Sequence, residues 1–126
     1  MTPYLGPIEA LTVANGYFRQ VLFTGKHEQL VLMCLQPGEE IGEEVHADTD
    51  QFFRIEEGEA RFLFDGKEAH LVRAGDAVVV PAGTLHNVIN TSPTKALKLY
   101  TLYAPPNHPD GTVQKTKAEA GHHATV

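Results

Sequence analysis

A histidine placed directly behind a rigid turn is the residue of this chain best suited to hold a metal ion. His86 follows Pro81 and Gly83. Pro81 has no N–H to donate to a neighbouring strand, so it ends the apolar run from Ala77 to Val80. Gly83 can adopt a backbone conformation that a side chain would obstruct. A new strand can then begin near His86, and the imidazole, the commonest metal ligand in proteins, would be held still.

Two sets of spacings resemble the two characteristic motifs of the cupin superfamily. The second motif is matched at every position, by Gly75, Pro81, Gly83, His86 and Asn90. The first motif is matched in register by Gly38, Glu44, His46, Gln51 and Gly58. This first motif departs from the family pattern twice, because Glu44 stands where a histidine is usual and Gln51 stands where a glutamate is usual.

The resemblance implies a metal site at four positions. The ligands of the family fall on Glu44, His46, Gln51 and His86 of this sequence. All four side chains offer a donor atom, whereas drift away from metal binding would leave some side chains that cannot coordinate. The resemblance therefore implies one divalent transition-metal ion per chain. The donor set accepts zinc, iron, manganese, nickel or cobalt, and the sequence does not choose among them.

Short strands separated by turns must position these residues. The stretch that begins at Gln51 alternates, with Phe53 and Ile55 on the same face as Gln51. Asp65-Gly66 is among the strongest short signals for a β-hairpin. Short strands at close intervals predict an all-β barrel or sandwich. The cupin resemblance implies the first of these, a single-domain antiparallel jelly-roll barrel.

We expect three segments along the chain. Residues 1–16 would form an N-terminal lead-in with a short strand near residues 11–13. Residues 17–104 would form the barrel, with Glu44 and His46 two apart on one strand and therefore on the same face. Residues 105–126 would form a C-terminal tail with at most a short helix around residues 114–120.

Side chains that point into a barrel must line any pocket beside the metal. The candidates are Phe53, Phe62, Phe64, Val88 and Tyr103. A phosphate group would need arginine or lysine donors there. Arg54, Arg61 and Lys98 alternate away from the inward faces, so this pattern favours a neutral or weakly polar small molecule.

The amino-acid composition limits the classes of partner and the cellular location that we expect. The 126 residues are 42% hydrophobic and carry a net charge of −6, with ten scattered Lys and Arg residues. Nucleic acids and anionic membranes require clustered basic residues, so we expect neither as a partner. No apolar run is long enough to span a membrane. The single cysteine, Cys34, cannot form an internal disulfide, which favours a cytoplasmic location.

Two apolar runs predict a homodimer. Leu30 to Leu35 and Ala77 to Val80 are apolar on both faces of the expected strands. Such strands need cover on both sides. The barrel interior supplies one cover, and the N-terminal segment or a partner subunit must supply the other.

Three functions fit this sequence. The first is a metal-dependent isomerase or lyase, in which the ion polarises a carbonyl or hydroxyl compound. The second is an Fe(II)-dependent dioxygenase, for which two histidines and one carboxylate are the usual ligands. The third is a non-catalytic module that binds a small, sugar-like molecule. The first is slightly favoured, because nothing in the sequence marks a redox role.

Overall fold

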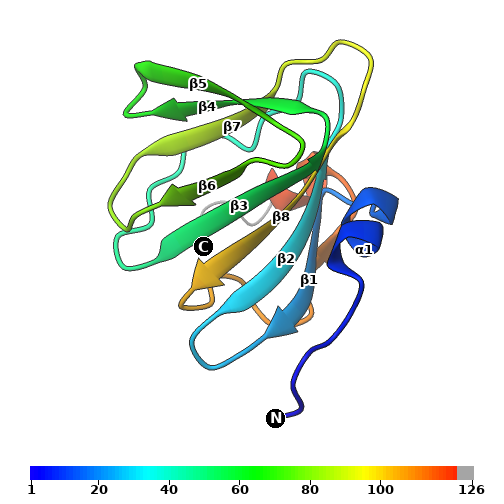
Figure 1. The fold of residues 1–126 in the computed structure, drawn as a ribbon. Helices are drawn as coiled ribbons and strands as arrows, with labels where there is room; N and C mark the ends of the chain where they lie inside the picture. Colours follow the sequence, from blue (N-terminus) through cyan, green and yellow to red (C-terminus); the bar gives the residue numbers. More distant parts are fainter. Residues whose placement is uncertain (122–126) are drawn as a thin grey trace.

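Residues 1–121, which the computed structural model describes, form two facing antiparallel sheets and two short helices (Figure 1). The larger sheet contains, in spatial order, β6 (Ala77–Val80), β3 (Asp50–Glu57), β8 (Leu97–Ala104), β2 (Gln29–Leu35), β1 (Arg19–Thr24) and β9 (Val113–Gln114). The smaller sheet contains β5 (Glu68–Arg73), β4 (Glu59–Phe64) and β7 (His86–Asn90). The helices are α1 (Ile8–Ala14) and α2 (Lys117–Gly121). The predicted all-β antiparallel fold is confirmed.

The core lies between the two sheets and follows the predicted alternation. In β3, Gln51, Phe53 and Ile55 are all buried, so they share the inner face as expected. Phe53 meets Phe62 of β4 edge-to-face across the sheets, with ring centroids 5.1 Å apart. Burial of each such aromatic side chain contributes about 2 kcal/mol, so these contacts hold the two layers together.

The predicted hairpin between β4 and β5 is present. Asp65 and Gly66 both have positive φ angles, 55° and 71°, which is the backbone of a tight turn between twisted strands. Asparagine, aspartate and glycine tolerate this conformation better than other residues. The local sequence therefore fixes the register of β4 against β5, in which Phe62 pairs with His70.

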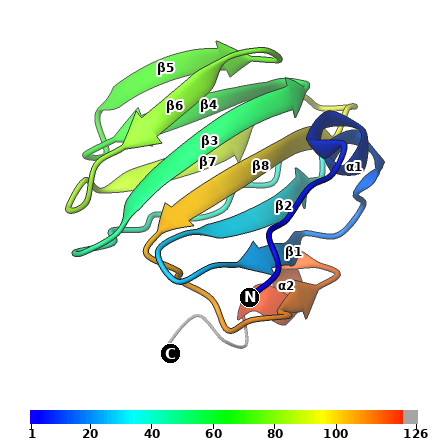
Figure 2. The same ribbon diagram turned by 60° about the horizontal axis from the view of Figure 1, so that its bottom comes forward.

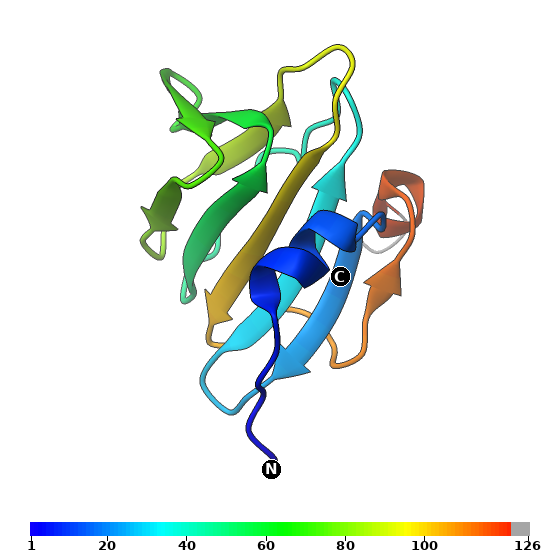
Figure 3. The ribbon, with the colours of Figure 1, turned by 45° about the vertical axis from the view of Figure 1, so that its right-hand side comes forward.

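The N-terminal segment corrects one expectation. Residues 11–13 belong to helix α1, so the predicted short strand is wrong. Ile8, Leu11 and Thr12 recur at helical spacing, and the Thr12 hydroxyl donates to the Ile8 carbonyl at 2.7 Å. The helix lies across the outer face of the larger sheet, over β2 and β8 (Figure 3). The chain therefore has a helix near its N-terminus, α1, in addition to the short helix α2 near its C-terminus.

The two apolar runs have different surroundings. In β2, Leu32 and Cys34 on the outer face are buried, because α1 covers them. In β6, the expectation of burial on both faces is wrong. Ala77 is exposed and Val79 is 64% exposed, since β6 lies at an edge of the sheet with nothing on its outer face within residues 1–121.

The segment after β8 returns to the larger sheet. Strand β9 pairs with β1, where Arg19 lies opposite Gln114. Helix α2 follows β9 and lies beside that edge of the sheet (Figure 2). Two histidines of the expected C-terminal tail, His122 and His123, lie outside the described residues. Within residues 1–121, no helix is long and apolar enough to cross a membrane.

Candidate metal centre

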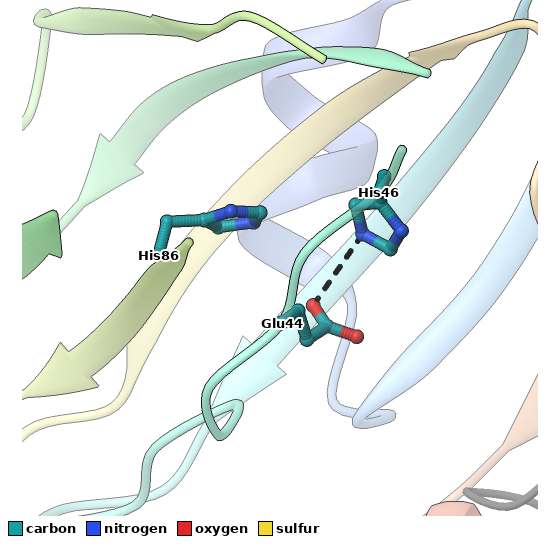
Figure 4. A group of neighbouring side chains, drawn as sticks. All are labelled: Glu44, His46 and His86. Carbon is teal, nitrogen blue, oxygen red and sulfur yellow. Dashed lines mark ion pairs between the residues drawn. The ribbon is translucent and has the colours of Figure 1, made fainter. Parts of the chain in front are cut away.

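Three of the four predicted ligands come together between the sheets. Glu44, His46 and His86 each place one ligand atom so that these atoms lie within 4.8 Å of one another (Figure 4). His86 comes from the start of β7, whereas Glu44 and His46 come from the chain between β2 and β3. Residues up to 42 positions apart in sequence, on two different segments, thus form one cluster.

Backbone hydrogen bonds explain why these residues meet. Glu44 and His86 pair directly, with each backbone N–H donating to the carbonyl of the other at 2.8 and 2.9 Å. The expectation that Glu44 and His46 lie within one strand is wrong, because this stretch forms only isolated bridges to β7. Gly83, at φ 87°, donates its N–H to the His46 carbonyl at 2.8 Å. The turn before His86 therefore also positions His46.

The hydrogen bond of His86 fixes which nitrogen faces the cluster. Nδ1 lies 3.0 Å from the Thr84 carbonyl, which can only accept, so Nδ1 carries the hydrogen. In the neutral ring Nε2 then has a lone pair. Nε2 lies 3.2 Å from Oε1 of Gln51. His86 is therefore oriented as a metal-binding histidine usually is, with a carbonyl behind it.

Thr101 fixes the orientation of the Gln51 amide. The Thr101 hydroxyl donates its single hydrogen to the Phe52 carbonyl at 2.8 Å. Its oxygen must then accept the second bond, which the Gln51 Nε2 group donates at 3.0 Å. Oε1 of Gln51 consequently faces His86. When the His86 ring is neutral, Oε1 of Gln51 and Nε2 of His86 are therefore two acceptor atoms that point at each other.

Glu44 and His46 complete the cluster. Nε2 of His46 is buried without a hydrogen-bond partner within residues 1–121, and it lies 3.8 Å from Oε1 of Glu44. Burial alone would raise the pKa of Glu44. The adjacent His46 and the more distant Arg19 more than offset this effect, so the pKa lies below its usual value. Glu44 is therefore a carboxylate at neutral pH.

A pocket of about 900 Å³ opens beside this cluster. Glu44 and His46 form part of its wall, together with Arg19, His108 and Lys117. Its volume is that of a small-molecule site. A molecule in this pocket can therefore contact two of the clustered residues directly.

The aromatic and aliphatic candidates occupy a different place. Phe53, Phe62, Val88 and Tyr103 belong to the core, Phe64 packs against it, and none of the five is among the residues that line this pocket. The ring of Phe53 lies edge-on to His86 and that of Tyr103 edge-on to His46, with centroids 6.0 and 5.8 Å apart. These two rings pack against the imidazoles of His86 and His46.

The structure brings two residues to the pocket that sequence patterns missed. As their parity predicted, none of Arg54, Arg61 and Lys98 lines the pocket; Lys98 instead donates to the Asn15 carbonyl. Arg19 is the cation that the parity argument overlooked, although it shares the buried parity of Val21. His108 reaches the pocket because the buried Gln29 side chain accepts its backbone N–H at 3.0 Å.

The chain belongs to the cupin family. Residues 31–103 match the family model described as the cupin domain. The chain is 51% identical over 123 residues to the uncharacterized protein YrkC of Bacillus subtilis, covering 94% of this chain but only 66% of YrkC. It is 44% identical over 121 residues to the uncharacterized protein L612 of Acanthamoeba polyphaga mimivirus, covering 94% of this chain and 75% of L612. The crystal structure of BH2720 from Bacillus halodurans superposes with a TM-score of 0.93 at 44% identity, covering 96% of this chain and 95% of that one.

Proposed function

We propose that Glu44, His46, Gln51 and His86 bind one divalent transition-metal ion. The observation that carries this proposal is the contact between Nε2 of His86 and Oε1 of Gln51. In the neutral form of the His86 ring both atoms are acceptors, their hydrogen-bond partners hold them in that orientation, and they lie 3.2 Å apart. Buried acceptors that face each other repel, and a cation between them turns this repulsion into attraction.

The spacing of the donor atoms supports the same proposal. Metal bonds to imidazole nitrogen and carboxylate oxygen are about 2.0–2.2 Å long, so neighbouring ligand atoms around one ion lie about 3–3.5 Å apart. The distances of 3.2 Å between His86 and Gln51 and 3.8 Å between His46 and Glu44 are close to this range. The unpartnered Nε2 of His46 would gain a partner. Glu44 would supply the negative charge.

We further propose that the protein is a metal-dependent isomerase or lyase for a small carbonyl or hydroxyl compound. When bound, a divalent ion would act as a Lewis acid toward a substrate oxygen. The chain would supply the pocket that holds the substrate and a group that takes its proton.

His108 is the best candidate for that group. Burial and, as a smaller contribution, the positive charge of Arg19 together lower the pKa of His108 to about 4, so the ring is neutral at pH 7. The ring nitrogen Nε2 lies 3.3 Å from the hydroxyl of Tyr103. Burial raises the pKa of that phenol, so it keeps its proton and can orient the imidazole.

Elemental analysis of the purified protein tests the metal site. We expect about one transition-metal ion per chain, and its loss in the double variant His46→Ala, His86→Ala. The matched control is His27→Ala, His70→Ala, which removes two exposed histidines away from the pocket. No metal after purification, combined with no binding when several divalent ions are titrated, would refute the site.

A turnover screen separates the three functions. Carbonyl compounds and phenols are incubated with protein loaded with each metal, with and without oxygen. Turnover with redox-silent Zn²⁺ in the absence of oxygen is the expected result. Oxygen consumption that depends on Fe²⁺ would replace this function with a dioxygenase, and ligand binding without any turnover would replace it with a binding module.

A further inference from the structure

A buried arginine shares the pocket with the metal-binding cluster. Arg19 lies at the start of β1 and is only 6% exposed, and its side chain forms part of the pocket wall beside Glu44 and His46. A cation removed from water to this degree is costly unless an anion or a full set of acceptors replaces the lost hydration.

The partners of Arg19 do not neutralise it. Its Nη1 donates to Oε1 of Gln114, a neutral amide, at 2.7 Å, and its guanidinium lies 5.1 Å from the centre of the Phe18 ring. Its Nε is buried and has no hydrogen-bond partner in the described part of the chain. Within residues 1–121, no carboxylate oxygen lies within 4.0 Å of the guanidinium nitrogens, although four other ion pairs do meet this limit. Arg19 therefore has both unused donor capacity and an unpaired charge.

The other charged residues around the pocket do not neutralise the guanidinium of Arg19. Glu44 is the carboxylate whose pKa Arg19 helps to lower, but Glu44 lies beside His46 and is assigned to the metal. Glu43 and Lys117 also line the pocket, on exposed or partly exposed parts of the chain. Their opposite charges offset each other, so Arg19 is the buried, uncompensated charge of the pocket.

We propose that Arg19 binds a carboxylate group of the substrate, which is therefore a small hydroxy acid or oxo acid. The hydroxyl or carbonyl oxygen of the same molecule would face Glu44 and His46. This assignment rests on the proposed function for the role of the metal, but the arginine site itself does not require the ion. It replaces the neutral substrate favoured by the sequence.

A single carboxylate fits the charges better than a phosphate. A carboxylate brings one negative charge to one buried guanidinium, which is the usual pairing of arginine with planar oxyanions. A phosphate group carries up to two charges and would need further cations beside Arg19. Lys117 also lines the pocket, but its charge is offset by that of Glu43 on the same wall.

Calorimetric titration with paired probes tests this proposal. Pyruvate and lactate are each compared with their neutral amides, pyruvamide and lactamide, on protein loaded with Zn²⁺ and on metal-free protein. We expect the acids to bind the wild-type protein roughly ten- to a hundredfold more tightly than the amides, the usual range for a hydrogen bond to a charged group. Arg19→Gln should reduce this ratio to about one. Arg61→Gln, which removes an exposed arginine on β4, should leave it unchanged.

A second variant guards against a folding defect in Arg19→Gln. Gln114→Glu keeps Arg19 but places a carboxylate where the amide now accepts from Nη1. This internal ion pair should lower the acid-to-amide ratio in the same way, with the fold checked by thermal unfolding.

The outcomes separate the arginine site from the metal site. A ratio that stays high in both variants, or acids that fail to bind the wild-type protein at millimolar concentration, would overturn the proposal. Inorganic phosphate that binds through Arg19 more tightly than either acid would overturn the assignment to a carboxylate. If Zn²⁺ does not bind, the metal site fails alone, and the ratio on metal-free protein still decides the role of Arg19.

Discussion

Replacing Thr101 by valine tests whether the orientation of Gln51 matters for metal binding. Thr101 is fully buried, and valine has nearly the same shape. The change removes the hydroxyl that accepts from Nε2 of Gln51 at 3.0 Å and donates to the Phe52 carbonyl at 2.8 Å. The Gln51 amide can then rotate so that its NH₂ group donates to Nε2 of His86, which blocks the metal position.

The hydrogen bonds of Gln51 give the expected size of the loss of metal affinity in Thr101→Val. To keep Oε1 toward the metal, the variant must leave the buried Nε2 group of Gln51 without an acceptor, which costs about 1–3 kcal/mol. Since about 1.4 kcal/mol corresponds to a factor of ten, metal affinity should fall roughly 5- to 150-fold. This agrees with the roughly 10- to 100-fold loss that follows removal of a group hydrogen-bonded to a metal ligand.

Competition against a chromogenic chelator measures this change. The matched control is Thr12→Val, because Thr12 is also fully buried and its hydroxyl also donates to a carbonyl, but within α1. We expect the control to bind Zn²⁺ as the wild-type protein does. If Thr101→Val binds Zn²⁺ within twofold of the control, the Gln51 amide does not coordinate through the held oxygen, and this reasoning is refuted.

Three further predictions follow from the same geometry. Glu44→Gln should weaken metal binding by at least the roughly 10- to 100-fold that loss of an outer partner costs, whereas Gln51→Glu should tighten it and make the ion a poorer Lewis acid; the chelator competition measures both. In the metal-free protein, His108 is harder to protonate when folded (pKa about 4, against 6.5 unfolded), so stability should fall as the pH drops from about 6.5 toward 4. Urea unfolding of His108→Asn should show a smaller loss over this range, and parallel curves for the variant and the wild type would contradict the explanation. We also predict a homodimer through the exposed outer face around Val79, so light scattering should give twice 13.8 kDa rather than 13.8 kDa.

Local patterns were sufficient for much of the fold. Alternation in β3 placed Gln51 and Phe53 on the inner face, because a strand turns successive side chains to opposite sides. Asp65-Gly66 fixed a hairpin because both residues tolerate positive φ angles. The motif spacing also led to Glu44, His46 and His86, which the structure brings together.

Features that depend on distant partners could not be predicted in this way. The seven residues of α1 offer too few turns for a clear helical period, and the helix is held by packing on β2, β3 and β8. Val79 is exposed because β6 is an edge strand, which its own apolar sequence does not reveal. Arg19 enters the pocket wall through pairing with Gln114, which is 95 residues away in sequence.

The most direct test of the metal site is anomalous X-ray diffraction from crystals grown with the metal that the protein retains. We predict one anomalous peak per chain, about 2.0–2.2 Å from Nε2 of His46, Nε2 of His86, a carboxylate oxygen of Glu44 and Oε1 of Gln51. An absent peak at this position, with Gln51 rotated so that its NH₂ group donates to His86, would contradict the proposed metal site.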